Sequence, residues 1–180
     1  DNAVSACGVG ALGEGDGFVS LGTSGVVLAG RDRYAPRAES AVHTFCHAVP
    51  DRWYQMGVVL AATDSLNWLS RVTGQSPSVL SDAVGYSLMP PGAVRFYPYL
   101  SGERTPHNDA QIRGGFTGLE VATGPEDLTR AVMVGVSFAL RDSLEALRST
   151  GTQLDSALAI GGGCRSDHWT TLLATILNIP

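Results

Sequence analysis

The stretch from Gly17 to Gly30, GFVSLGTSGVVLAG, decides the fold class that this sequence predicts. Phe18–Leu21 and Val26–Ala29 are short apolar runs, and a loop of glycine, threonine and serine separates them. Two β-rich runs around a short turn are typical of a β-hairpin. We therefore expect a pair of antiparallel strands here.

The hairpin loop, Gly22-Thr23-Ser24-Gly25, has the composition of a phosphate-binding turn. Its glycines carry no Cβ, so backbone N–H groups can converge on one point, and the two hydroxyl groups add further donors. Glycine turns serve purely conformational needs more often than they bind phosphate. Phosphate binding is therefore a hypothesis that other parts of the chain have to support.

Downstream, the chain predicts a second pair of strands and then a helix. His43–Val49 and Trp53–Val58 are β-rich runs around a Pro-Asp turn dipeptide. From about Val59 the apolar spacing changes to three and four residues, and Gly74 ends that pattern as a glycine after a helix does. The segment from Ser76 to Pro91 contains three prolines and is expected to be a loop.

The clearest helix is expected from Pro125 to about Ser149. Proline suits the first turn of a helix, Thr123 is the candidate cap, and Gly151 marks the end. Apolar residues recur along this segment at spacings of three and four, which predicts one buried stripe. The stripe consists of Leu128, Val132, Val136, Leu140, Leu144 and Leu147.

Near the end of the chain, a short apolar strand, a glycine turn and a helix follow one another. Ala157–Ile160 is the strand, Gly161–Gly163 the turn and Ser166–Leu177 the helix. This order is typical in outline of a phosphate or nucleotide site, but the spacing is not the GxGxxG of dinucleotide-binding folds. Together with the two hairpins it predicts a single α/β domain.

Composition excludes several classes of function. The chain has 180 residues, of which 44% are hydrophobic and 16% charged, enough for one folded domain. A net charge of -5 and singly scattered arginines argue against nucleic-acid binding. No apolar run approaches the roughly 20 residues that span a bilayer, so no membrane contact is expected. Cys46 lies between His43 and His47, a pattern that could suggest a metal site, but no carboxylate is close in sequence. We therefore expect the histidines to be structural and the cysteines to be free thiols.

Two further places hold chemically useful side chains. Asp1 is a carboxylate that could act as a general base, although a terminal aspartate is usually only solvated. The segment Phe96–Asn108, FYPYLSGERTPHN, combines aromatic, charged and turn residues as a functional loop does. Its Glu103 and Arg104 could equally form a surface ion pair of little energetic value.

Five segments of the chain resemble the FGGY family of carbohydrate kinases, and within it most closely the bacterial xylulokinases. They occur along the chain in the same order as in that family. The most specific is PYLSGERTPHND at Pro98–Asp109. The other four are DNAVSACGVG at Asp1–Gly10, SLGTSG at Ser20–Gly25, ESAVHTFCHAVPDRWYQMGV at Glu39–Val58 and IGGGCRSDHW at Ile160–Trp169. The resemblance therefore extends over nearly the whole chain.

This resemblance implies an actin-like (ribonuclease H-like) ATPase domain with a mixed sheet flanked by helices. Members of the family have two such domains around a cleft, with the sugar mainly against the first and ATP mainly against the second. Residues 1–180 then correspond to the C-terminal, nucleotide-binding domain, incomplete and without the N-terminal sugar-binding domain. Both ends of the chain are expected to lie inside a longer protein.

Carried over residue by residue, the resemblance gives the first part of the chain a role in phosphoryl transfer. Asp1, in the sequence Asp-Asn-Ala, becomes the catalytic base that accepts the proton of the sugar hydroxyl. The turn at Gly22, Thr23 and Ser24 would meet the β- and γ-phosphates. Mg²⁺ would bridge phosphate oxygens and retain several waters.

The resemblance also implies nucleotide contacts later in the chain. Gly162, Gly163 and Ser166 match the region that lines the adenosine, although Ser166 stands where many relatives have asparagine, so the adenine contact departs from the family pattern. Arg104 would line either the nucleotide side of the cleft or the contact between the two domains.

The implied function is the ATP-dependent phosphorylation of a sugar hydroxyl, from D-xylulose to D-xylulose 5-phosphate, by the intact cytoplasmic enzyme. Two alternatives stay open: the kinase acts on another sugar or polyol such as ribulose or gluconate, or the chain alone is a nucleotide-binding module without activity. The partners would be a small-molecule sugar and ATP, and dimers are frequent among the relatives, so a homodimer is implied as well.

Overall fold

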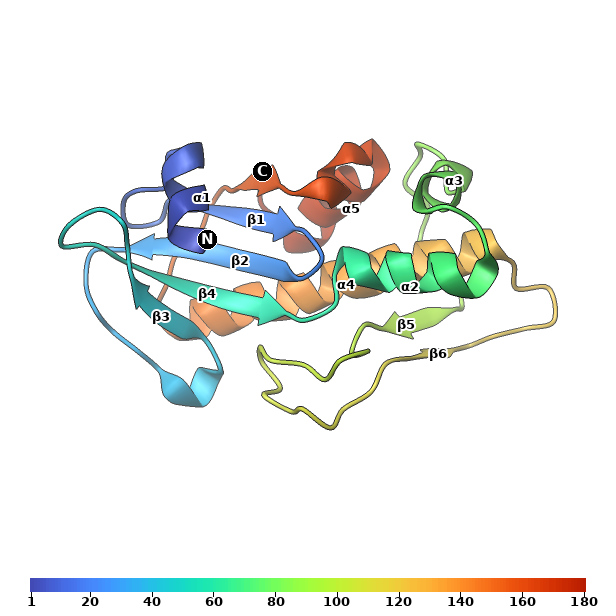
Figure 1. Ribbon diagram of the computed structural model, residues 1–180, viewed down its shortest axis with the longest axis horizontal. Helices are drawn as coiled ribbons and strands as arrows, with labels where there is room; N and C mark the ends of the chain where they lie inside the picture. The colour runs from blue at the N-terminus through green and yellow to red at the C-terminus, as the bar shows by residue number, and fades with distance from the viewer.

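A computed structural model describes all residues from 1 to 180 and contains a five-stranded sheet in the order β3-β4-β2-β1-β7 (Figure 1). All neighbouring strands are antiparallel except β1 and β7, which are parallel, so the sheet is mixed. The strands are β1 (Gly17–Leu21), β2 (Gly25–Arg31), β3 (His43–Cys46), β4 (Trp53–Val59) and β7 (Leu158–Ile160).

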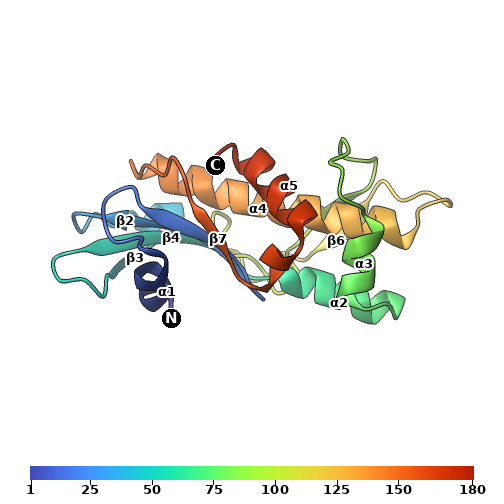
Figure 2. The same cartoon turned by 90° about the horizontal axis from the view of Figure 1, so that it is seen from above.

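Helices cover both faces of this sheet. Seen from above, α1 lies against one face, whereas the long helix α4 runs along the other (Figure 2). A small second sheet pairs β5 (Arg95–Tyr97) with β6 (Gly115–Thr117). The helices are α1 (Asn2–Val9), α2 (Thr63–Thr73), α3 (Pro77–Ala83), α4 (Pro125–Ser149) and α5 (Asp167–Leu177), with short 3-10 turns η1 (Ala38–Ser40) and η2 (Gly162–Arg165).

Alternating side chains of the hairpin β1-β2 build two separate cores. Phe18, Val26 and Leu28 are buried on the side of α1, in a cluster that also includes Tyr54 and, partly buried, Met56 and Val58 of β4. We call this side the α1 face. The residues between them, Val19, Leu21, Val27 and Ala29, are buried in the larger cluster that contains α4. Successive side chains of a strand point to opposite faces, which explains the division.

The long helix α4 confirms the predicted stripe. Five of its six members are fully buried, and the sixth, Leu128, is partly buried. The predicted cap Thr123 is wrong: Gly124 is the N-cap, its N–H donates to the Asp127 carboxylate at 3.0 Å, and the Thr123 hydroxyl accepts instead from the N–H of Glu120. A carboxylate at the third helical position can reach back to the cap, so glycine suffices there.

The predicted hairpins, the helix before Gly74 and the strand-turn-helix at the end are confirmed, with three differences. β3 ends at Cys46 rather than Val49, because the N–H of His47 donates to the carbonyl of Arg52 and closes the turn there. The Ser76–Pro91 segment is not all loop, because it contains α3, whose N-cap Ser76 accepts from Val79 N–H. The helix α1 was not predicted.

No helix, including the 25-residue α4, combines the length and the apolar character that crossing a membrane requires.

Candidate functional site

The turn between β1 and β2 is fixed through its carbonyl groups by the first turn of α2. The N–H of Thr63 and the Thr63 hydroxyl both donate to the carbonyl of Gly22, at 2.9 and 2.8 Å. The N–H groups of Ala62 and Asp64 donate to the carbonyl of Thr23, at 2.9 and 3.3 Å. A helix start has N–H groups without intrahelical partners, and here the turn satisfies them. The turn is therefore held rigidly against α2.

The N–H groups of the same turn are unused. None of the hydrogen bonds of the structure is donated by the backbone nitrogen of Gly22, Thr23 or Ser24. Thr23 and Ser24 are exposed residues. Adjacent free amides on a rigid turn are suited to an anion such as a phosphate group.

The second glycine turn packs directly on the first. Gly161 has a φ of 101°, and a Cβ there would lie 2.7 Å from the carbonyl oxygen of Leu21 and 3.0 Å from the nitrogen of Gly22. A Cβ on Gly163 would lie 2.5 Å from Cγ of Leu21. Both positions require glycine, because the two turns approach each other closer than any side chain allows.

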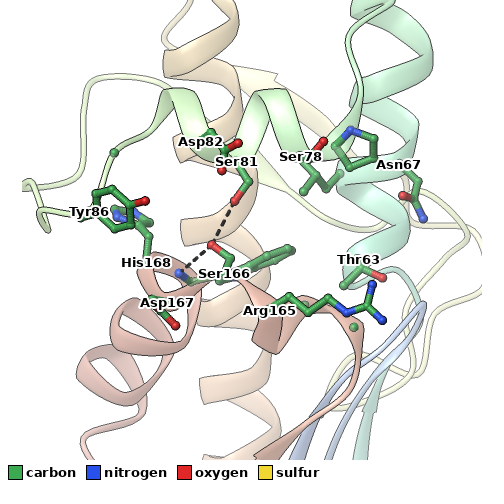
Figure 3. Close-up of a pocket in the computed structure, with 16 residues that line it drawn as sticks. Thr63, Asn67, Ser78, Ser81, Asp82, Tyr86, Arg165, Ser166, Asp167 and His168 are labelled. Carbon is green, nitrogen blue, oxygen red and sulfur yellow. Dashed lines mark hydrogen bonds between the residues drawn. The ribbon is translucent and has the colours of Figure 1, made fainter.

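Beside these turns lies a pocket of about 510 Å³, within the range of small-molecule sites. Its walls come from α2, α3, η2 and the start of α5, and its lining is mostly polar (Figure 3). Thr63, which holds the hairpin turn, lines the pocket together with Gly162 and Gly163. The turn with free amides thus adjoins one end of a cavity that has the size of a nucleoside.

Ser166 stands between two walls of the pocket. Its Oγ caps α5 by accepting from the N–H of Trp169 at 3.3 Å, and it also accepts from the hydroxyl of Ser81 on α3 at 3.0 Å (Figure 3). A hydroxyl oxygen has two acceptor lone pairs and one hydrogen to donate. Because both lone pairs are occupied, Ser166 can offer only its hydrogen to a ligand.

The wall that α3 provides was not anticipated from sequence. It adds Ser78, Ser81 and Asp82, and Tyr86 follows the helix as an almost fully exposed aromatic ring. The signal was present, because serine followed by proline is a helix start as well as a loop sequence. On α5, beside Tyr86, burial and then the charge of Arg130 lower the pKa of His168 (Figure 3).

Asp1 lies outside this pocket. It is exposed, precedes α1 and makes no side-chain capping bond, and the next residue, Asn2, places its side-chain nitrogen 3.3 Å from the sulfur of Met56. Met56 lies on the α1 face, three positions before Val59, the β4 residue that pairs with Gly25. At the rise of a strand, the start of α1 is roughly 10 Å along the sheet from the hairpin turn.

Arg104 also lies outside the pocket, on a loop that runs beside the end of β4. The Glu103 carboxylate accepts from the N–H groups of Leu60 and Arg104 at 3.0 and 2.7 Å. Thr105 exchanges hydrogen bonds with the backbone of Val58, at 3.1 Å in both directions. Glu103 and Thr105 are buried and Arg104 between them is exposed.

The structure therefore brings together the two glycine turns and Ser166, whereas Asp1 and Arg104 lie outside the pocket, toward the α1 face.

No group of three or more histidine, cysteine, aspartate or glutamate side chains could hold a metal ion. His47 is structural, because its ring nitrogens contact the carbonyl of Ala11 and the N–H of Val49, both at 3.1 Å.

Comparison with known proteins gives the family. The model of the "FGGY family of carbohydrate kinases, C-terminal domain" matches residues 17–180. The chain belongs to the FGGY family of carbohydrate kinases. The xylulose kinase of Escherichia coli (strain K12) is 45% identical over 180 residues, which cover 98% of this chain and 37% of that protein.

Solved structures of FGGY kinases show the same actin-like fold. A xyloylose kinase from Brucella ovis matches with a TM-score of 0.97 and 54% identity, over 99% of this chain and 37% of that one. A gluconate kinase from Lactobacillus acidophilus matches with a TM-score of 0.84 and 28% identity, again over 99% of this chain and 37% of that one. The FGGY chain thus spans well under half of the length of the relatives that it matches.

Proposed function

We propose that the chain is the C-terminal, nucleotide-binding part of a longer kinase that transfers the γ-phosphoryl group of ATP to D-xylulose. The observation that carries the proposal is the rigid turn at Gly22, Thr23 and Ser24, whose amides are unused and which adjoins a nucleoside-sized pocket. Relatives named xylulose kinase, with 45% and 43% identity, support the choice of sugar.

In this proposal ATP lies across the two glycine turns. The adenosine occupies the pocket along Gly162, Gly163 and Ser166, with the Ser166 hydroxyl as a donor to the nucleoside. The β- and γ-phosphates meet the free amides of the hairpin turn and the Thr23 hydroxyl. Donors that are fixed before the reaction stabilise charge in the transition state without reorganisation.

Asp1 is proposed as the base. Its carboxylate accepts the proton of the sugar hydroxyl while that oxygen forms a bond to the γ-phosphorus, and the bond from the γ-phosphorus to the bridging oxygen breaks to release ADP. Phosphoryl transfer has a loose transition state, so position matters more than basicity. Mg²⁺ bound to the phosphates would neutralise part of their charge and would retain several waters.

A second sugar remains a candidate, because the gluconate kinase of Lactobacillus acidophilus shares the fold at 28% identity. In this proposal most sugar contacts come from a domain outside residues 1–180, so these residues do not decide the choice of sugar. We further propose that the intact kinase is a cytoplasmic homodimer and that the chain alone binds nucleotide without phosphorylating sugar.

The test is a coupled ADP-release assay of the intact kinase with D-xylulose, ribulose, gluconate and glycerol. We expect the highest kcat/KM with D-xylulose and a loss of at least about a hundredfold in kcat for Asp1→Asn, as for removal of a general base. ATP affinity of that variant should stay near the wild-type value. Near-normal turnover of Asp1→Asn would refute the assignment of the base, and a preference for another sugar would replace xylulose.

A further inference from the structure

Arg104 carries an exposed guanidinium group next to the buried Glu103, but the two side chains form no salt bridge. It takes part in none of the salt bridges of the structure, and its side chain has one hydrogen-bond partner, Nε2 of His43, at 3.4 Å. An exposed arginine normally adopts many rotamers, and holding it in one costs entropy. A neutral partner restrains the side chain without cancelling its charge, which leaves the charge free for a ligand.

The backbone around Arg104 is fixed by its two neighbours. Glu103 is 3% exposed and Thr105 is 1% exposed, and each is bonded to the end of β4, at Leu60 and Val58 respectively. Glu103 and Asp109 also exchange backbone hydrogen bonds, both 2.9 Å, across the loop. The Arg104 Cα is therefore anchored on both sides, and only the side chain is free to be oriented.

The side chains of His43 and Arg104 lie on the same face of the sheet as the start of α1. His43 pairs with Met56 across β3 and β4, so both side chains point to the α1 face, where Met56 meets Asn2. Val58, which holds the loop, pairs with Val26 on β2, directly after the hairpin turn. Two strand spacings, roughly 10 Å, thus separate the loop from β2.

His43 is built to act as an acceptor. Its ring stacks on Phe45, with centroids 5.7 Å apart, which fixes the ring plane. Burial, and then the charge of Arg104, lower the pKa of His43 below its ordinary value of 6.5, so the ring is neutral near pH 7. A neutral ring with its proton on Nδ1 presents Nε2 as an acceptor for an arginine N–H.

We propose that His43 is a positioning residue that holds the Arg104 guanidinium over the α1 face, where Arg104 contacts the phosphoryl group as it passes from ATP to the sugar. This inference rests on the proposed kinase function. It places Arg104 outside the adenosine pocket, which it does not line, and on the same face of the sheet as the start of α1, with β4 between the Arg104 loop and the hairpin β1-β2. A fixed positive charge at that point stabilises the charge that develops on the equatorial oxygens.

The experiment compares variants of the intact kinase with Mg·ATP and D-xylulose. His43→Phe keeps a ring to stack on Phe45 but removes the acceptor, whereas His43→Gln keeps an acceptor. Arg71→Ala is the matched control, because Arg71 is an exposed arginine on α2 that has no partner and does not line the pocket. Thermal melting of every variant shows whether the fold is intact.

We expect kcat to fall at least about tenfold in His43→Phe, the loss of one hydrogen bond to a charged group, with KM for ATP changed less than about threefold. His43→Gln should recover most of kcat. Arg104→Ala should lose more than His43→Phe, and adding His43→Phe to Arg104→Ala should cause no further loss, because His43 acts through Arg104.

Three results would overturn the inference. The first is a kcat of the His43→Phe variant equal to that of the wild type. The second is a double variant, His43→Phe with Arg104→Ala, in which His43→Phe lowers kcat by the same factor as it does alone. The third is an Arg104→Ala variant that differs from the wild type only in KM for ATP or in domain assembly. If His43→Phe does not fold, His43→Ala, which also removes the acceptor, takes its place, and His43→Gln remains the variant that keeps an acceptor. A wild-type protein that phosphorylates no sugar would refute the proposed function itself, whereas an active wild type with unaffected variants refutes only the role of His43.

Discussion

Glu103 shows how a single buried carboxylate supports the loop that carries Arg104. One of its oxygens accepts two backbone N–H groups, and the other, Oε2, is buried without a partner. Burial raises the pKa of Glu103 above its ordinary value of 4.5, although the two N–H groups and Arg104 act in the opposite direction. The folded chain therefore binds this proton more tightly than the unfolded chain does.

The pH dependence of stability follows from that sign. A raised folded-state pKa contributes stability that is fully present below the unfolded value and is lost as pH rises through the folded value. Glu103→Gln keeps an acceptor for both N–H groups and has no proton to lose. We expect it to remove this decline and to stay within about 1 kcal/mol of the wild type at pH 7, whereas Glu103→Ala should cost about 2 kcal/mol.

Urea unfolding of the three proteins between pH 4 and pH 8 measures these free energies. An unchanged decline with pH in Glu103→Gln would show that another group titrates in this range.

At the contact of the two glycine turns, Gly161 and Gly162 are a matched pair of positions for substitution by alanine. Gly161 has a positive φ and no room for a Cβ, whereas a Cβ on Gly162 would meet nothing within 4 Å. Gly161→Ala should therefore lower the free energy of unfolding by about 2 kcal/mol, through backbone strain and displacement of Leu21. Gly162→Ala should unfold close to the wild type. Equal midpoints of chemical denaturation for both variants would contradict the packing of the turns.

Among the helices, α5 depends on the residue that also borders the pocket. Ser166→Ala removes the N-cap and should destabilise the chain by about 1 kcal/mol, while Ser166→Asn keeps a capping group. Ser156→Ala is the control, because Ser156 is exposed and makes no hydrogen bond. Denaturation curves in which Ser166→Asn loses as much as Ser166→Ala would argue against capping.

The elements that sequence predicted are those with strong local signals. The hairpin β1-β2, the stripe of α4 and the strand, glycine turn and helix at the end of the chain follow from residue types within a few positions of one another. The helix α1 was missed because its residues are small and mostly apolar, without a polar face. Ser76-Pro77 was interpreted as a loop, although proline is also favoured in the first turn of a helix.

The site divides in the same way. The glycine turns were predictable, because a glycine and its missing Cβ can be identified from the sequence directly. The contact of Ser81 on α3 with Ser166 joins residues 85 positions apart, and the contact of His43 with Arg104 joins residues 61 positions apart. Such contacts depend on how α3 and β3 pack in the folded chain. Local patterns carry no information about them.

For the molecule as a whole, the two proposed sites lie at different parts of the sheet. The α4 side supplies most of the core, and the pocket is built around α2, α3 and α5 at the end of the sheet where the hairpin turn lies (Figures 1 and 2). The α1 side carries Asn2 and His43, next to the proposed base and arginine. On the proposed function, nucleotide binding needs only this chain, whereas sugar specificity depends on residues outside it.

Isothermal titration calorimetry of the chain is the most direct test of that division. We predict that Mg·ATP binds at one site per chain and that D-xylulose, titrated without nucleotide, produces no binding heat. Binding of D-xylulose in the absence of ATP, or no binding of Mg·ATP by a chain that is demonstrably folded, would contradict the account.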